Sequence, residues 1–196
     1  MKASVILAHP YPKSFNHALF ARVRSALRRR GVETYAHDLY AEAFDPVLTV
    51  DELGSKRSED PLVKLYAQEL VHSDLLFFIH PNWWGQGPAM MKGYVDRVLR
   101  PPDAYDFPPG ASNGDIPDGK LRGKYGIVLN TSNTPEEREN EVFGDPLERE
   151  WRDCVFGFCG IEKYYRRMFR VVATSDDAQR KEWLDEAESI VEKVLG

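Results

Sequence analysis

The feature of this sequence that most constrains its fold is a fivefold alternation between strand patterns and segments with helical periodicity. Residues 4–8 and 75–79 are continuous apolar runs, which are typical of strands covered on both faces. Residues 32–38, 124–129 and 164–172 are further strand patterns, and polar residues in the last of them indicate a sheet edge. Strands separated by helices in this way predict a parallel sheet.

Helical stripes occupy the intervals between these strands. Two of the helices begin with an acidic N-cap followed by proline, at Asp60 and at Asp145. Helices are expected over residues 16–30, from 61 onward, over 88–100, from 146 onward and over 178–195. No linker and no internal repeat interrupts the alternation. The sequence therefore predicts a single α/β domain over residues 1–196, with a doubly wound five-stranded parallel sheet in a three-layer α/β/α arrangement.

Charge and hydropathy exclude several classes of protein. The net charge of −5 leaves no global cationic field, so no nucleic-acid partner is expected. The arginines at 28–30 and 166–167 are interpreted as solvated charge at element ends. No apolar stretch approaches the ~20 residues that span a bilayer, and the first apolar run is too short for a signal peptide. The chain is expected not to span a membrane.

The two cysteines, Cys154 and Cys159, match no zinc or redox spacing. They are interpreted as small buried apolar groups, and no metal site is predicted. A reducing cytoplasm is the expected location.

Candidate site residues follow from the fold class. In a doubly wound sheet, ligands bind outside the carboxyl ends of the strands, where the strand order reverses. The segments that follow the first, third and fourth strands are HPYPKSFN (9–16), HPNWWGQGP (80–88) and NTSNTPEER (130–138).

The first segment, residues 9–16, leads into a helix N-terminus, where free N–H groups and the helix dipole favour phosphate. His9 and Lys13 can add charge, and Ser14 and Asn16 can donate from their side chains. Simple helix capping by Ser14 or Asn16 explains the stretch equally well. Both alternatives stay open at this point.

The second segment carries adjacent tryptophans, Trp83 and Trp84, next to Gly85. The indoles could pack under the following helix, with the glycine permitting a turn. Alternatively, consecutive residues of an extended loop point in opposite directions. One indole would then pack inward while the other offers a flat face to a planar ligand such as flavin.

The third segment places small hydroxyl and amide side chains directly after a strand, at Asn130, Thr131, Ser132 and Asn133. A turn explains them, and so does hydrogen bonding to the polar edge of a heterocycle held between this segment and the previous one. All three segments are expected at the same end of the sheet.

Four stretches, at residues 8–16, 81–99, 104–107 and 143–160, carry a family resemblance over nearly the whole chain. The chain resembles the NAD(P)H quinone reductase family of flavodoxin-like flavoproteins. That family includes quinone reductases, drug-modulator-type NADPH reductases and ancillary subunits of potassium-efflux systems. The resemblance implies a single flavodoxin-like flavin-binding domain over residues 1–196.

The resemblance also implies roles for particular residues. The loop that holds the flavin phosphate corresponds to His9, Ser14, Phe15 and Asn16. The loop beside the isoalloxazine corresponds to Pro81, Asn82, Trp83, Trp84 and Gly85. The loop at the other edge of the ring corresponds to Asn130, Thr131, Ser132 and Asn133. The aromatic pair that overhangs the substrate face from a neighbouring subunit corresponds to Tyr105 and Phe107.

Two departures from the family pattern matter. Animal quinone reductases carry a Tyr and a His after the fourth strand, where this chain has Glu137 and Phe143. Their proton relay is therefore not carried over, and no catalytic side chain is assigned. The segment 45–60 is short, which favours FMN over FAD as the cofactor.

The expected function is hydride transfer from NAD(P)H through flavin N5 to a quinone or similar small acceptor, by a ping-pong mechanism in a homodimer with its site at the interface. Backbone N–H groups of Trp83 and Trp84 are expected to matter more than their indoles. Two alternatives remain, namely a regulatory subunit of a potassium-efflux transporter and a one-electron carrier of the flavodoxin type.

Overall fold

A five-stranded, all-parallel sheet with strand order β2-β1-β3-β6-β7 forms the centre of the molecule. The computed structural model describes residues 1–54, 57–111 and 115–196. The strands are β1 (Lys2–Leu7), β2 (Glu33–Asp38), β3 (Leu75–Pro81), β6 (Tyr125–Ser132) and β7 (Lys163–Arg170). The predicted strands are confirmed to within a few residues at their ends, and β7 is an edge strand, as its polar pattern indicated.

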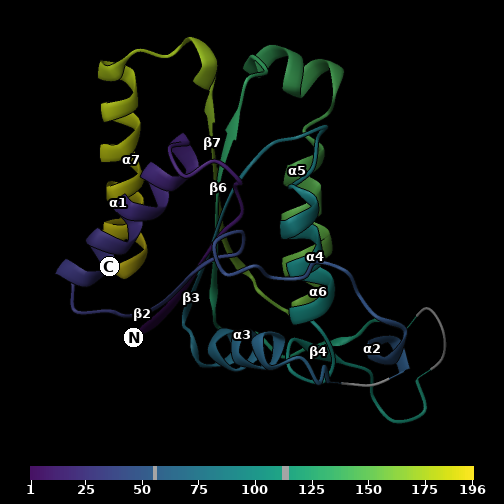
Figure 1. The fold of residues 1–196 in the computed structure, drawn as a ribbon. Coiled ribbons are helices and arrows are strands. Elements are labelled where there is room, and N and C mark those ends of the chain that lie inside the picture. The colour runs from purple at the N-terminus through teal and green to yellow at the C-terminus, as the bar shows by residue number, and fades with distance from the viewer. Residues whose placement is uncertain (55–56, 112–114) are drawn as a thin grey trace.

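Helices cover both faces of this sheet (Figure 1). The helices α1 (Phe15–Arg29) and α7 (Asp177–Leu195) lie on one face. The opposite face carries α3 (Pro61–His72), α4 (Ala89–Val98) and the helical segment that begins with α5 (Pro146–Arg149). Each face has its own apolar core, because every strand of a doubly wound sheet buries side chains on both sides. The predicted three-layer fold is confirmed.

Side-chain caps fix the helix starts that the sequence predicted. Ser14 Oγ accepts from the His17 N–H at the start of α1, at 3.3 Å. Asp60 Oδ1 accepts from the Leu62 N–H at 2.9 Å at the start of α3, and proline occupies the first helical position there. These contacts satisfy N–H groups that have no partner within the helix.

The prediction of one regular α-helix from residue 146 onward is wrong. After α5 the chain forms a π-helical segment, η2 (Glu150–Phe156), and then α6 (Gly157–Cys159). A π-helical turn changes which side chains face the sheet, since it holds more residues than an α-helical turn. Trp151 and Phe156 are buried as a result, whereas Cys154 is exposed and Phe158 is 41% exposed. The expectation that both cysteines are buried holds only for Cys159.

Short elements outside the main alternation were not predicted. They are α2 (Val50–Gly54), the antiparallel pair β4 (Tyr105–Asp106) and β5 (Asp118–Gly119), the π-helical segment η1 (Arg138–Val142) and the 3₁₀ turn η3 (Val172–Thr174). Elements of two to five residues are too short to show a period in the sequence. Within the described ranges, no helix combines the length and the apolar character needed to cross a membrane.

Candidate functional site

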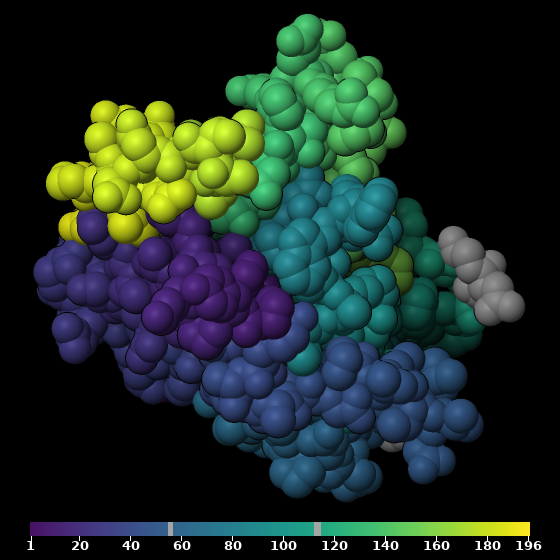
Figure 2. All heavy atoms as spheres, turned by 45° about the horizontal axis from the view of Figure 1, so that its top comes forward, coloured from purple at the N-terminus to yellow at the C-terminus, as the bar shows by residue number. Residues whose placement is uncertain are grey.

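The site lies where the sheet reverses its order. The chain runs from β1 outward to β2 and then crosses back to β3 on the other side of β1, so the loops after β1 and β3 leave in opposite directions. Figure 2 shows this end of the molecule, with the loop after β1 (purple) beside the loop after β3 (teal) and the segment after β6 (green) rising above them. The three predicted segments therefore meet at one face.

The loop after β3 forms a tight hairpin rather than an extended strand. Trp83 and Gln86 exchange two backbone hydrogen bonds, at 2.9 and 3.1 Å. Between them Trp84 and Gly85 both have positive φ, at 58° and 76°, as a two-residue hairpin of type I′ requires. A Cβ atom at Gly85 would lie 2.7 Å from Cγ of Pro146, so glycine is needed there for space as well as for conformation.

Neither indole of this hairpin packs inward, which corrects the expectation of one buried and one exposed ring. Trp83 is 42% exposed and lies against His9, with ring centroids 5.8 Å apart, and Trp84 is fully exposed. The turn also occupies the Trp83 N–H, which donates to the Gln86 carbonyl. The N–H groups of Trp84 and Gly85 have no acceptor among the described residues, so these two remain available to a ligand.

Two carboxamide side chains at this face, one buried and one half-buried, form a hydrogen bond through the amide nitrogen but not through the amide oxygen. Asn16 Nδ2 donates to Thr131 Oγ1 at 2.8 Å, and Asn82 Nδ2 donates to Glu139 Oε1 at 3.0 Å. Within the described chain, the Oδ1 atoms of both asparagines and Oε2 of Glu139 are buried without a hydrogen-bond partner. Each such oxygen costs about 1–3 kcal/mol unless something donates to it. The chain thus presents acceptors for which a bound ligand would supply the donors.

The loop after β1 leads directly into the N-terminus of α1. The first N–H groups of α1 point out of the helix without intrahelical partners, next to the cap residue Ser14. His9 Nδ1 accepts from the Tyr11 N–H at 3.1 Å, and burial lowers the pKa of His9. Phe15 turns its ring away from this loop, edge-on to Phe169 and Trp183 in the core, at 6.1 and 5.6 Å. Only the backbone of Phe15 faces the candidate phosphate position.

A buried histidine supports the hairpin from below. His80 is fully buried, and burial lowers its pKa to about 4, so the ring is neutral. With its proton on Nδ1, the ring donates to the Pro81 carbonyl at 2.9 Å and accepts the Trp151 Nε1–H at 3.0 Å. Asn130 Nδ2 also lies 3.1 Å from His80 Nε2. A Cβ atom at Gly87 would lie 3.3 Å from this ring, so the residue directly after the hairpin packs closely against it.

Arg166 extends this network to the sheet edge. Its Nε–H donates to Asn130 Oδ1 at 2.9 Å, and its guanidinium forms a bidentate pair with Asp145, at 2.7 and 2.8 Å. The side chain is only 6% exposed, so the prediction of a solvated arginine is wrong at this position. The cluster at 28–30 does lie in solvent, where Arg29 pairs with Glu188 of α7.

The strand β6 is longer than predicted, so Asn130, Thr131 and Ser132 are its buried last residues, and only Asn133 follows it. Asn130 faces His80 and Arg166 rather than the loop tip. Thr131 bonds Asn16 and accepts from the Asn82 N–H through its carbonyl, at 2.7 Å, which joins all three segments. Ser132 Oγ accepts from the N–H of Thr134, and Asn133 Oδ1 accepts from the N–H of Ala173.

Tyr105 and Phe107 are not brought to this face of the same chain. Their rings pack edge-on with Phe158, at 4.7 and 6.4 Å. The strand β4 that carries Tyr105 lies at the lower end of Figure 1, opposite the loops after β3 and β6. Within one chain these aromatic side chains cannot overhang the hairpin.

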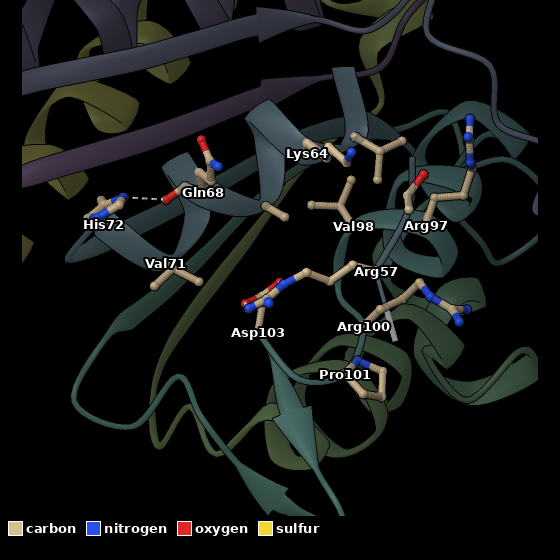
Figure 3. A pocket seen from close by; sticks show the side chains of 13 residues that line it. Arg57, Lys64, Gln68, Val71, His72, Arg97, Val98, Arg100, Pro101 and Asp103 are labelled. Atoms are coloured by element: carbon tan, nitrogen blue, oxygen red, sulfur yellow. Dashed lines mark hydrogen bonds and ion pairs between the residues drawn. The ribbon is translucent and has the colours of Figure 1, made fainter. Parts of the chain in front are cut away.

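Two cavities are candidates for the ligand-binding site. One of about 480 Å³ opens between the hairpin and the segment after β6, and its lining residues are Asn82, Trp84, Gly85, Thr134, Glu139, Phe143 and Pro146. Another of about 410 Å³ lies between α3 and the C-terminal end of α4. Figure 3 shows this second cavity, with the ion pair of Arg57 and Asp103 across from α3. Its position at the amino ends of the strands is remote from the switch point.

Sequence patterns did not reveal the buried polar groups of the site. Glu139 and His80 are fully buried, and Trp151 is 2% exposed. Nothing in the spacing of Glu139 distinguishes it from its neighbours Glu137 and Glu141. The apolar run before His80 indicated a buried strand, and that was the one available sign that His80 is neutral and enclosed.

Comparison with known proteins identifies the class. A model of the family described as having a flavodoxin-like fold matches residues 1–195. The chain belongs to this family. The predicted fold class and the family resemblance are confirmed.

Named relatives narrow the class further. An uncharacterized NAD(P)H oxidoreductase of Haemophilus influenzae is 29% identical, over 94% of this chain and 91% of the relative. A ribosyldihydronicotinamide dehydrogenase (quinone) of Pongo abelii is 30% identical, over 82% of this chain and 78% of the relative. The predicted enzyme class, an oxidoreductase, is confirmed.

Solved structures agree with the sequence relatives. The NAD(P)H:quinone oxidoreductase of Methanothermobacter marburgensis is 25% identical, with a TM-score of 0.80 over 100% of this chain and 98% of that one. An FMN-dependent NADH-azoreductase of Bacillus anthracis, solved in complex with FMN, is 15% identical with a TM-score of 0.78 over the full length of both chains. The azoreductase is similar in fold.

Proposed function

We propose that this chain is a flavin-dependent NAD(P)H oxidoreductase that reduces a quinone or a similar small acceptor. The observation that carries the proposal is the set of buried oxygens without donors, on Asn16, Asn82 and Glu139, at the switch point of a flavodoxin-like sheet. The names of the curated relatives support the same activity.

The residues present fit a flavin. The first turn of α1, next to Ser14, would hold the phosphate. The available N–H groups of Trp84 and Gly85 would donate to the ring. FMN is favoured over FAD because the segment 45–60, of which residues 55 and 56 lie outside the described ranges, leaves little chain to shelter an adenine. An FMN complex is known for a protein of the same fold.

When bound, the flavin would supply the hydride chemistry, while the protein supplies position and electrostatics. Trp84 and Gly85 would stabilise negative charge with backbone donors already fixed by the hairpin, so no reorganisation would be needed during the reaction. The exposed indoles would form a wall beside the open face. The same face would receive NAD(P)H and then the acceptor, in a ping-pong sequence.

A homodimer would complete the site. Tyr105 and Phe107 lie together at the opposite end of the molecule from the hairpin (Figure 1). They would therefore reach only a substrate bound to a second copy of the chain. A groove of about 370 Å³ runs between α4 and η2, with Val95, Val155 and Phe158 in its lining, and would accept that copy.

The test is flavin reconstitution followed by turnover. The purified chain is incubated with FMN or FAD, freed of unbound flavin by gel filtration and assayed with NADH and NADPH against a benzoquinone. Retention of FMN, with oxidation of NAD(P)H that depends on the quinone, is expected. A chain that stays colourless and inactive with both flavins would overturn the proposal. No observation in the described chain specifically favours the transporter-subunit or one-electron-carrier alternatives.

A further inference from the structure

Glu139 is an unusual residue for a buried position. Its side chain has no solvent exposure, and it makes no ion pair within the described chain. The backbone on both sides holds it in place, because its N–H donates to the Pro135 carbonyl and its carbonyl accepts from the Asp145 N–H, each at 3.0 Å. A buried carboxyl group with an oxygen that has no hydrogen-bond partner is costly, and a bound ligand is one way to compensate it.

The carboxylate fixes the orientation of Asn82. Glu139 Oε1 accepts from Asn82 Nδ2 at 3.0 Å, so the amide nitrogen faces Glu139. The Asn82 backbone is held independently, by its N–H bond to Thr131. The amide oxygen of Asn82 is consequently left over, together with Oε2 of Glu139, and both are buried without partners in the described chain.

These two leftover oxygens, which we call the acceptor pair, belong to residues that line the same cavity. Trp84, Phe143 and Pro146 provide flat and apolar surface around it, and its volume of about 480 Å³ suits a ring system. The pair offers acceptors only, one of them on a carboxyl group. A ligand edge that carries an N–H donor would therefore bind there, and an edge that carries a carboxylate or phosphate would be rejected.

We propose that the acceptor pair, Asn82 Oδ1 and Glu139 Oε2, recognises an N–H donor on the edge of a flat heterocycle. The inference rests on the proposed function, which offers two sources of that chemistry. One is the imide N–H of the isoalloxazine, and the other is the carboxamide of nicotinamide. Glu139 then acts both as an acceptor and as the positioning residue of Asn82.

The first arm of the test measures the flavin source by equilibrium binding. Fluorescence titration compares FMN with 3-methyl-FMN, in which a methyl group replaces the imide hydrogen. If the pair binds the imide, the wild-type chain prefers FMN by about tenfold or more, because the methylated ring leaves buried acceptors unpaired. Glu139→Gln keeps the acceptor for Asn82 but turns the second atom into a donor, so it reduces this preference to about threefold or less.

The second arm measures the nicotinamide source. On the flavin-loaded chain, the perturbation of the flavin spectrum reports binding of oxidised NAD and of its nicotinic acid analogue, with no turnover involved. If the pair binds the carboxamide, the wild-type chain prefers the carboxamide by about tenfold or more, and Glu139→Gln lowers that ratio. The arm that shows the effect identifies the source.

Two further variants complete the design. Glu137→Gln makes the same charge change on the exposed residue two positions earlier and leaves both ratios at their wild-type values. Asn82→Ala removes the other acceptor and lowers the same ratio as Glu139→Gln, which covers the case in which one variant fails to fold. Unchanged ratios in both arms for Glu139→Gln and Asn82→Ala would overturn the inference alone. A wild-type chain that binds neither flavin would overturn the proposed function and the inference together.

Discussion

Several residues in this site use one polar atom for a hydrogen bond within the protein and leave another polar atom without a partner among the described residues. Asn16 and Asn82 use their nitrogens inside the protein and keep an oxygen without a partner in the described chain. Trp84 is more extreme, because the hairpin holds its backbone in the left-handed region while its indole lies wholly in solvent. A non-glycine residue in that conformation costs about 1–2 kcal/mol, and strain of this kind concentrates at functional sites.

Replacing Trp84 by glycine should separate stability from binding. Glycine adopts positive φ without strain and no buried contact is lost, so we expect the free energy of unfolding in urea to stay constant or rise by up to about 1 kcal/mol. The dissociation constant for FMN should increase by about three- to tenfold, since an aromatic wall contributes about 0.5–1.5 kcal/mol. Trp183→Ala, in the core, should instead cost about 3–5 kcal/mol of stability. Unchanged FMN affinity in Trp84→Gly would contradict the role of the indole.

His80 should make stability depend on pH. Burial lowers the pKa of His80 from its usual value of 6.5 to about 4 in the folded chain, so the unfolded chain binds the extra proton first as the pH falls. Stability from this group is complete above pH 6.5 and declines as the pH falls toward 4, by about 2 kcal/mol between pH 7 and pH 5.

The measurement is the free energy of urea unfolding at pH 7 and at pH 5. His80→Gln should be less stable than the wild type at both values but should lack most of the difference between them. An identical pH dependence in the two proteins would show that the ring is not held neutral.

Among the elements, η2 and β7 depart most from what periodicity indicated. The π-helical turns of η2 direct Trp151 to His80 while exposing Cys154. The strand β7 reads as a polar edge, and yet Arg166 on it is buried between Asp145, Glu148 and Asn130. Trp151 and Arg166 thereby both join the hydrogen-bond network of His80 and Asn130 next to the hairpin.

Neighbouring arginines on β7 provide a matched pair of substitutions. Arg166→Met should destabilise the chain by about 3–5 kcal/mol, because it leaves Asp145 and Glu148 without their buried cation. Arg167→Met removes a half-exposed pair with Glu186 and should cost less than about 1 kcal/mol. Chemical denaturation of both variants under one condition checks the difference. Equal losses would mean that burial of Arg166 carries no special weight.

For the whole molecule, the sheet order β2-β1-β3-β6-β7 decides where the site lies. The positions of Tyr105 and Phe107 bear on whether a second subunit completes that site. The strand β4 and the hairpin after β3 lie at opposite ends of the molecule (Figure 1). The predicted substrate contacts of Tyr105 and Phe107 therefore require a dimer.

We expect sedimentation velocity to give twice the mass of one chain. Phe158→Asp, which places a charge in the groove between α4 and η2, should shift the population to monomer. Val71→Asp makes the same kind of change on an exposed apolar residue of α3, outside that groove, and should leave the dimer intact. A wild-type chain that sediments as a monomer at micromolar concentration would exclude the dimer.

The sequence by itself determined the parallel α/β fold, the helix starts at Asp60 and Asp145, and the three segments that meet at the switch point. These are local signals, carried by periodicity and by caps within a few residues of each other. Only the tertiary structure decided which atoms are left without partners. The contacts Asn16–Thr131, His80–Trp151 and Asn82–Glu139 join residues 115, 71 and 57 positions apart, and no pattern within one element records such pairings.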